Sequence, residues 1–372
     1  MNRFVLAAAA SVAGTATAMA GGLDRSNQNI NILFEDGNYA ELSFGYVSPT
    51  VDGTDVAAFG GRPSGDVADS FLQGSLSFKQ DLNDQLSFAL IADQPYGANV
   101  AYPTTASGGS VALGGTTATL DSSSLTWMMR YKFTDRFSVH GGLRAQQFNG
   151  AVRLGGLAYG GLNGYSTTLD GDTALGYQVG AAYEIPEIAL RVAMTYFSEI
   201  DHDVTVTENG AASSNIEVTT PEAINLSFQT GIAEGTLLFG SFRYADYSVT
   251  QVRPVGFSAA TGGASLTQVD KVRDYTLGIG RRFTDKLSGS ATLLYNHGGS
   301  DDLVSPLAPT NGSYGITLAA SYQATDQLRV SGGVNYTRLG DAFPETGTPD
   351  TARASFDDNS FVGVGIRIGY SF

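Results

Sequence analysis

The chain has 372 residues, with 36 acidic and 21 basic side chains, a formal net charge of -15 and no cysteine. The absence of cysteine excludes disulfides, thiolate metal sites and a cysteine nucleophile. The acidic balance without a basic cluster argues against a nucleic-acid partner, because phosphate contacts need clustered lysine and arginine. Charged residues are 15% of the chain and aromatic residues 10%, so the composition does not match a disordered chain.

The N-terminus has the features of a secretory signal peptide. A short positive region ends at Arg3, an apolar stretch covers 4–13, and Ala18–Ala20 forms a small-x-small cleavage site. We therefore expect residues 1–20 to be a signal peptide. No other stretch approaches about 18 consecutive apolar residues, so we expect no transmembrane helix. The chain is then either a soluble exported protein or a β-barrel.

Apolar and small polar residues alternate along most of the chain, which is the period of a β-strand with two different faces. In 39–48, Ala40, Leu42, Phe44 and Tyr46 alternate with Glu41, Ser43 and Gly45. The same alternation recurs at 125–133, 137–144, 175–184 and 328–336. A soluble sandwich would make its outer face rich in lysine and glutamate, whereas a small polar face suits a barrel lumen.

Aromatic residues stand at the ends of the apolar faces, where amphipathic rings suit the boundary between water and lipid. They include Tyr131, Tyr183, Tyr196, Tyr244, Tyr295, Tyr322, Tyr336 and Tyr370. This placement favours a membrane barrel over a soluble exported protein.

Short and long connections alternate between the predicted strands. The short turns are at 81–84, 134–136, 185–187, 233–235, 284–286 and 324–326. The long connections are at about 49–69, 98–120, 150–172, 200–220, 248–271, 297–312 and 339–358. Six turns and seven loops predict an all-β, transmembrane antiparallel β-barrel of about fourteen strands, with the short turns on the periplasmic side. We therefore expect the chain to lie in the outer membrane of a Gram-negative bacterium.

The last predicted strand alternates Val362, Val364, Ile366 and Ile368 with small or polar residues and ends on the aromatic Phe372. A terminal aromatic on the final strand is what outer-membrane assembly machinery reads in many such proteins, so we expect Phe372 to contact it. The alternative is a strand that merely ends there.

Several stretches resemble the FadL-type family of outer-membrane long-chain fatty acid transporters. They are 37–49 followed by Val51 and Gly53, then 93–98, and then 221–231 with the aromatic-rich strand that runs on to Tyr247. The resemblance implies a hatch segment at 21–37, in or under the lumen, and a barrel with long extracellular loops at 38–372. The Asn-Pro-Ala stretch of the family's hatch is missing, so the chain looks like a short-hatch variant.

The resemblance also implies a route for the substrate. A long-chain fatty acid or similar hydrophobic compound is captured at the extracellular loops and bound in the barrel. It then leaves sideways into membrane lipid through a gap beside a kinked third strand. Here that strand contains Pro95, Tyr96 and Gly97; proline removes a ladder donor and glycine weakens a strand or marks a bulge. The alternative is that Pro95 only ends the strand.

Candidate substrate-binding residues come from three regions. In the hatch they are Ile32, Leu33 and Phe34, which could instead pack a periplasmic linker on the barrel base. On the lumen face they are Arg130 and Arg144, since an arginine fork suits a carboxylate. The alternative for these inward arginines is pairing with Glu41, Glu184 or Asp274. In the loops they are Phe59, Leu157 and Tyr159, which could instead pack the loops together.

Catalysis is not expected. The three histidines, His140, His202 and His297, are scattered, and neither a nucleophile elbow nor a metal-ligand spacing is present. We expect no cofactor and no metal. The leading hypothesis is uptake of hydrophobic compounds, the alternative is a general diffusion porin for small polar solutes, and an outer-membrane lipase or acyltransferase is disfavoured. A closed barrel needs no partner strand, so we expect a monomer.

Overall fold

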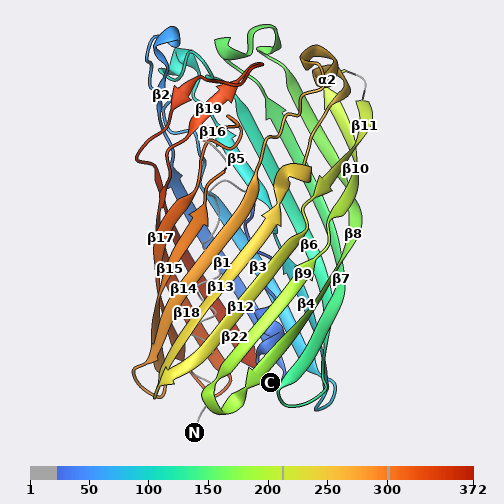
Figure 1. Cartoon of the computed structure of the whole chain (residues 1–372), viewed down its shortest axis with the longest axis vertical. Helices are drawn as coiled ribbons and strands as arrows, with labels where there is room; N and C mark the ends of the chain where they lie inside the picture. Colours follow the sequence, from blue (N-terminus) through green and yellow to red (C-terminus); the bar gives the residue numbers. More distant parts are fainter. Residues whose placement is uncertain (1–22, 212, 300–301) are drawn as a thin grey trace.

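The structure, a computed structural model, describes residues 23–211, 213–299 and 302–372. The predicted signal peptide, residues 1–20, lies outside the described residues. Within them the chain forms an antiparallel β-barrel (Figure 1). The wall closes because β1 (Tyr39–Thr50) and β22 (Ser360–Ser371) pair along their full lengths. No helix in these ranges is long and apolar enough to cross a membrane.

The described residues make fourteen wall strands, which confirms the predicted fold class and the six short turns. Three wall strands are each divided in two. In wall order the strands are β1, β3 (Phe71–Asp81), β4 (Leu86–Asp93) with β5 (Gly97–Ala101), β6 (Thr117–Lys132), β7 (Phe137–Arg153), β8 (Ser166–Ile185), β9 (Leu190–Phe197) with β10 (Ile200–Glu208), β11 (Ser213–Thr220) with β12 (Ala223–Ala233), β13 (Thr236–Asp246), β14 (Lys271–Arg282), β15 (Leu287–His297), β17 (Ser313–Gln323), β18 (Leu328–Leu339) and β22.

The two faces of the wall differ as the alternation predicts. On β7, Leu143 points outward and is 54% exposed, whereas the next residue, Arg144, points inward and is 3% exposed. Trp127 on β6 and Tyr131 near its end are likewise exposed on the outer face. In a bilayer these outward side chains contact lipid, and the inward polar face is shielded from it.

One predicted loop, 200–220, is instead a hairpin of the two strands β10 and β11. Its inward residues His202, Val204 and Val206 are buried, while Asp201 and Asp203 point outward and are exposed. Acidic outward residues suit a wall segment that stands above the apolar belt. Because the outward residues are polar, the strand period does not show as an apolar stripe, and the sequence reads as a loop.

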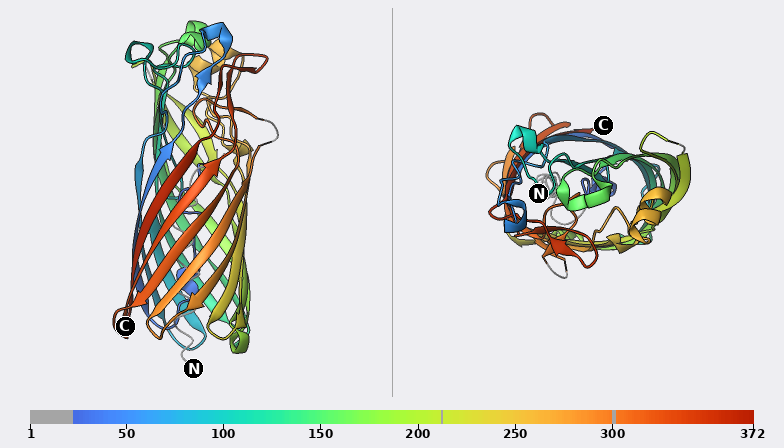
Figure 2. Two further views of the ribbon diagram at one scale, coloured as in Figure 1. Left: turned by 90° about the vertical axis from the view of Figure 1, so that its left-hand side faces the viewer. Right: turned by 90° about the horizontal axis from the view of Figure 1, so that it is seen from above.

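The long loops gather over one end of the barrel, as the view from above in Figure 2 shows. They carry η3 (Ala57–Phe59), η4 (Thr105–Ser107), η5 (Leu157–Leu162), η7 (Tyr247–Val249), α2 (Val255–Thr261), β2 (Thr54–Asp55), β16 (Leu303–Val304), β19 (Phe343–Thr346), β20 (Thr351–Ala352) and β21 (Ala354–Ser355). Beneath them Val51, Val67, Leu113 and Phe356 are buried in one apolar cluster. The opposite end has short turns, one of them with η6 (Pro186–Ile188).

Residues 23–37 occupy the lumen and include the short helix η2 (Asn31–Phe34), drawn in blue inside the lower barrel in Figure 1. Two ion pairs fix this hatch. Arg243 of β13 holds Asp24 through two contacts of 2.8 and 3.0 Å, and Arg329 of β18 contacts Glu35 at 3.3 Å. The partners in the first pair are almost fully buried.

We predict that Arg243→Met undocks the hatch. Arg243 also donates to Gln28 and to Asn225, so its loss leaves Asp24 and two amides without their partner. Breaking a buried ion pair costs about 3–5 kcal/mol. The expected result is a higher ion conductance of the purified barrel in a planar bilayer. Arg136→Met, which removes an exposed pair with Glu187 at a periplasmic turn, is the control and should leave conductance unchanged.

An unchanged conductance for Arg243→Met would contradict this account of the anchor, provided that heat-dependent gel mobility shows a folded barrel.

Candidate functional site

The upper half of the lumen holds an apolar cavity between the hatch and the loops. It encloses about 810 Å³, including the part open to solvent, within the range of pockets for small molecules. Its wall is almost entirely apolar. The lining includes Leu23, Tyr96, Ala98, Ala118, Leu120, Phe148, Val152, Leu169, Val218, Pro221, Tyr247, Val252, Val269 and Leu307.

Arg144 lies below this cavity and is the candidate that can hold a charged head group. Its side chain is buried, its Cζ lies 5.8 Å from the Phe197 ring centre, and Nε and Nη1 have no hydrogen-bond partner. It lies within electrostatic range of the cavity residue Tyr96. Gln146 lies two residues further along the inward face of β7. Its Nε2 donates a hydrogen bond to Thr220, another cavity residue, at 3.1 Å. A buried cation without a partner is unfavourable, and a carboxylate would satisfy it.

The third wall strand is interrupted beside the same cavity. Backbone pairing of β3 with β4 ends at Leu76 and Ala92 and resumes only at Ala68 and Val100. We call the interval between these two pairs the pairing gap. Among the described residues, one side chain replaces a lost backbone hydrogen bond in this gap: Gln94 Oε1 accepts from the backbone N–H of Gly74 at 3.3 Å.

The residues predicted to form the kink, Pro95, Tyr96 and Gly97, all lie at this interruption. Toward β6, three residues, 94–96, stand opposite only two, because Asp93 pairs with Ser124 and Gly97 pairs with Asp121. One extra residue on one of two paired strands is the definition of a β-bulge, which bends the strand. The Tyr96 backbone accordingly bonds to the hydroxyl of Ser122 rather than to a ladder partner.

The hatch replaces part of the missing pairing. Asp24 forms an antiparallel bridge with Tyr96, Arg25 N donates to Pro95 O at 2.8 Å, and Gly97 N donates to Leu23 O at 2.9 Å. The Arg25 side chain then fills the space beside Gly97, where a Cβ would overlap its guanidinium. A side chain at 97 would therefore displace Arg25 from this position.

Arg25 is buried in that position. Its Cζ lies 3.7 Å from the centre of the Phe71 ring, and Nε and Nη2 have no hydrogen-bond partner. Burial lowers the pKa of the guanidinium to about 10, with Asp121 acting in the opposite direction. Arg25 is therefore still a cation at neutral pH.

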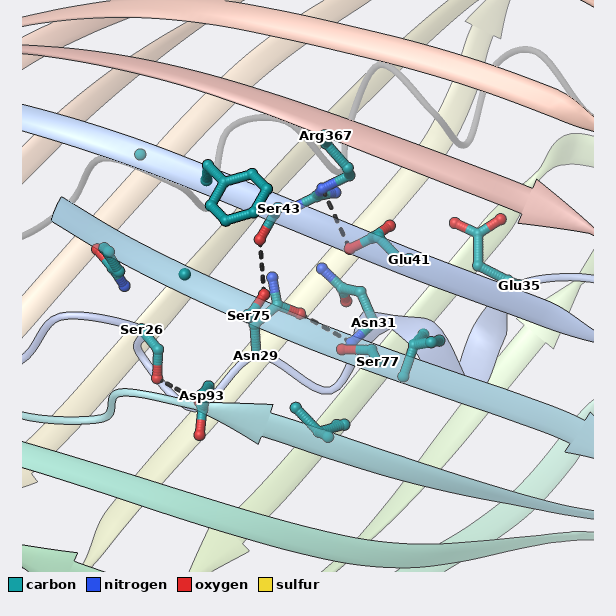
Figure 3. Close-up of a pocket in the computed structure, with 16 residues that line it drawn as sticks. Ser26, Asn29, Asn31, Glu35, Glu41, Ser43, Ser75, Ser77, Asp93 and Arg367 are labelled. Atoms are coloured by element: carbon teal, nitrogen blue, oxygen red, sulfur yellow. Dashed lines mark hydrogen bonds and ion pairs between the residues drawn. The ribbon is translucent and has the colours of Figure 1, made fainter.

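Below the pairing gap lies a polar pocket between the hatch and strands β1, β3, β4 and β22 (Figure 3). Ser26 Oγ donates to Asp93 at 2.5 Å across it, and Arg367 contacts Glu41 at 3.2 Å. Gly74 and Phe44 also line it, and Phe44 is exposed on the outer face. The pocket thus lies against the inner side of the wall at the interrupted pairing.

The predicted hatch residues pack lower in the lumen. Ile32 and Leu33 are buried, and Phe34 lies between Arg130 and Arg191, with ring-to-Cζ distances of 4.6 and 4.4 Å. From the hatch, Leu23 rather than these residues lines the apolar cavity.

The two predicted arginines differ. Arg130 pairs with Glu184 and also donates to Ser138 and to the carbonyl of Leu33, so it supports the hatch. Arg144 lacks such partners at Nε and Nη1. Arg243 pairs with Asp24, whereas Asp274 accepts from Asn296.

The predicted loop residues lie above the cavity. Phe59 and Tyr159 pack against the buried cluster of the loops, and Leu157 is 63% exposed at the barrel mouth. Tyr159 and Phe59 therefore pack in the same group of loops above the cavity, but neither residue lines the cavity.

Sequence reasoning missed Arg25, Leu23 and most of the cavity lining. A signal for the cavity was present, because the inward residues Val152, Leu169 and Val218 are apolar at strand positions where the lower lumen has serine, threonine or glutamine. No such signal marks Arg25, since its role depends on where the hatch docks. Among the described residues, no group of three or more histidine, aspartate or glutamate side chains is placed to hold a metal ion.

Comparison with known proteins agrees with this architecture. The model of the family described as outer membrane protein transport protein (OMPP1/FadL/TodX) matches residues 4–362. None of the curated proteins matches. A FadL homologue of Pseudomonas aeruginosa is similar in structure, with 16% identity, a TM-score of 0.74, and 97% of this chain and 98% of that chain covered.

Two further solved structures have the same fold. The toluene transporter TodX of P. putida has 12% identity and a TM-score of 0.63, with 91% of this chain and 90% of that chain covered. The CymD monoaromatic hydrocarbon channel has 13% identity and a TM-score of 0.59, with 100% and 99% covered. The family match over nearly the whole chain, together with the closed barrel, places the protein in the outer membrane of a Gram-negative bacterium: it belongs to the OMPP1/FadL/TodX family of transporters for hydrophobic compounds.

Proposed function

We propose that this chain takes up long-chain fatty acids or similar amphiphilic hydrophobic compounds and releases them sideways into the membrane. The observation that carries the proposal is that the apolar cavity ends against Tyr96, within the interruption of the third strand. A ligand in the cavity therefore lies beside the pairing gap. The docked hatch argues against the porin alternative, because it is tied to β12 and β13 across the lumen and narrows the path that small polar solutes would need.

In this proposal the loops capture the compound and the cavity binds its apolar part. Leu157, Phe59 and Tyr159 offer apolar surface at the mouth. Ile32, Leu33 and Phe34 pack the hatch in the lumen below the pairing gap and therefore lie off this lateral route. No catalytic step is required, and the protein acts on its substrate by binding alone.

Arg144 favours a fatty acid over a hydrocarbon. Structures with this fold include channels named for toluene and for monoaromatic hydrocarbons, and an apolar cavity suits those compounds equally well. A hydrocarbon, however, leaves the two unpartnered nitrogens of Arg144 unsatisfied, whereas a carboxylate accepts hydrogen bonds from both.

The outer surface suggests the remaining partners. Phe372 is exposed at the periplasmic end and stacks on Phe78, with ring centres 5.7 Å apart, so the assembly machinery could reach it before the strand is inserted. Membrane lipid covers the outward apolar face. The closure of β1 on β22 leaves no strand waiting for a partner subunit, and we propose a monomer.

A disulfide across the pairing gap should stop release. Gly74 and Gln94 face each other there, and the chain has no native cysteine. In the variant Gly74→Cys with Gln94→Cys, oxidation should strongly reduce uptake of labelled hexadecanoate by cells, and a reductant should restore it. The matched control is Leu76→Cys with Ala92→Cys, the last regular pair below the gap, where oxidation should change nothing.

Full uptake through the oxidised gap variant, with disulfide formation verified, would rule out lateral release at this place.

Replacing Arg144 tests the substrate's head group. Hydrogen bonds to charged groups contribute about 1.5–3 kcal/mol, so Arg144→Met should weaken hexadecanoate binding to the purified barrel by roughly tenfold to hundredfold. Binding of hexadecan-1-ol, which has no charge, should change little. Equal losses for both compounds would point to damage to the cavity instead of a lost carboxylate contact.

A further inference from the structure

The pairing gap is closed by a buried arginine, Arg25, which is stabilised by an aromatic ring and the charge of Asp121 more than by hydrogen bonds. Arg25 lies between the start of β3 and the start of β5, stacked on Phe71 and filling the space beside Gly97. Gly97 shares its face with Asp121, its direct partner on β6, and Asp121 is exposed on the outside of the barrel. The Arg25 side chain therefore enters the thickness of the wall from the hatch.

Its surroundings give Arg25 little compensation. Two of its guanidinium nitrogens, Nε and Nη2, have no hydrogen-bond partner, and only 5% of the residue is exposed. The other hatch anchors are fully paired by comparison, since Asp24 is held by two contacts from Arg243. Burying a cation without a partner is unfavourable, so Arg25 will move toward an anion that comes within reach.

The segment around Arg25 is held from two sides of the barrel, by β13 through the contacts of Arg243 with Asp24 and Gln28, and by the third strand. Beyond the bridge to 95–97, Ser26 donates to Asp93, and Gln28 donates to the Tyr96 hydroxyl at 3.1 Å. The next turn is strained, because Asn27 and Gln28 both have φ near +50°, a region that non-glycine residues rarely adopt.

An anion can arrive from the cavity. Tyr96 lies near both Arg144 and Arg25, since Arg144 is within electrostatic range of its ring and the backbone N–H of Arg25 donates to the carbonyl of the preceding residue. Leu23, two residues before Arg25, lines the cavity itself. Tyr96 therefore stands between a carboxylate held near Arg144 and the plug.

We propose that Arg25 is a specificity-determining plug of the pairing gap that an anionic head group releases. A carboxylate reaching the lower end of the cavity binds the free nitrogens of Arg25 and draws the side chain out of the wall, which opens the exit for the attached chain. A neutral compound of the same length forms no ion pair with Arg25, so the side chain stays in the wall and the exit stays closed. The inference rests on the proposed function, and it adds that the substrate opens its own exit by charge.

The test compares two compounds that differ only in the head group. Uptake of labelled hexadecanoate and hexadecan-1-ol is measured in cells lacking the protein and supplied with wild type, Arg25→Gln or Arg25→Lys, each checked for folding by heat-dependent gel mobility. Wild type should take up the acid at least tenfold faster than the alcohol. Arg25→Gln should raise alcohol uptake several-fold above the wild-type rate, and Arg25→Lys should leave it at the wild-type rate. Arg144 is intact in both variants, so its contribution to acid binding is the same in each.

The outcomes separate the two proposals. If wild type transports neither compound, the proposed function fails and the plug fails with it. If wild type transports both equally, or if Arg25→Gln leaves alcohol uptake at the wild-type rate, the plug is overturned and hydrophobe uptake stands.

A second variant tests the movement itself. Ser26 Oγ and Asp93 Oδ2 are 2.5 Å apart, so Ser26→Cys with Asp93→Cys ties the residue next to Arg25 to the third strand. Oxidation should block hexadecanoate uptake and reduction should restore it, whereas the Leu76→Cys with Ala92→Cys control should be insensitive to both. Unchanged uptake through the oxidised tether would overturn the plug.

Discussion

Backbone pairing is the constraint on which the rest of this structure depends. A membrane wall must satisfy its N–H and C=O groups internally, because lipid offers no partner for them. The barrel achieves this by closing β1 on β22. The interruption of the third strand violates the rule locally, and the hatch repairs it by donating Arg25 N to Pro95 O and accepting Gly97 N at Leu23 O. The hatch is therefore a component of the wall as well as a plug of the lumen.

The inward face of the barrel changes in chemistry with height, and this change organises the site. In the lower lumen, arginines such as Arg130, Arg243 and Arg329 are committed to hatch or wall carboxylates. Higher up, inward residues such as Val152 and Val218 are apolar and form the cavity. The interrupted strand lies at the boundary between the two zones, so the apolar cavity ends where the backbone pairing of the third strand is broken.

Much of the fold could be predicted because it depends on local periodicity. The outward alternation through Leu143 and the turn lengths fixed the strand count, and the family match confirms the transporter class. The 200–220 hairpin was missed because its outward row contains Asp201 and Asp203, which hide the strand period. Contacts between distant segments were beyond sequence reasoning: Arg25 and Gly97 are far apart in the chain, and their contact depends on where the hatch docks.

We propose that this barrel carries a hydrophobic acid from the outside into the membrane. Uptake of labelled long-chain fatty acid should be measured in cells that lack the protein, with and without the gene restored. Uptake should rise with the restored protein and saturate with concentration, as binding in a cavity requires. No rise, in cells whose outer membrane contains the folded barrel, would contradict this proposal.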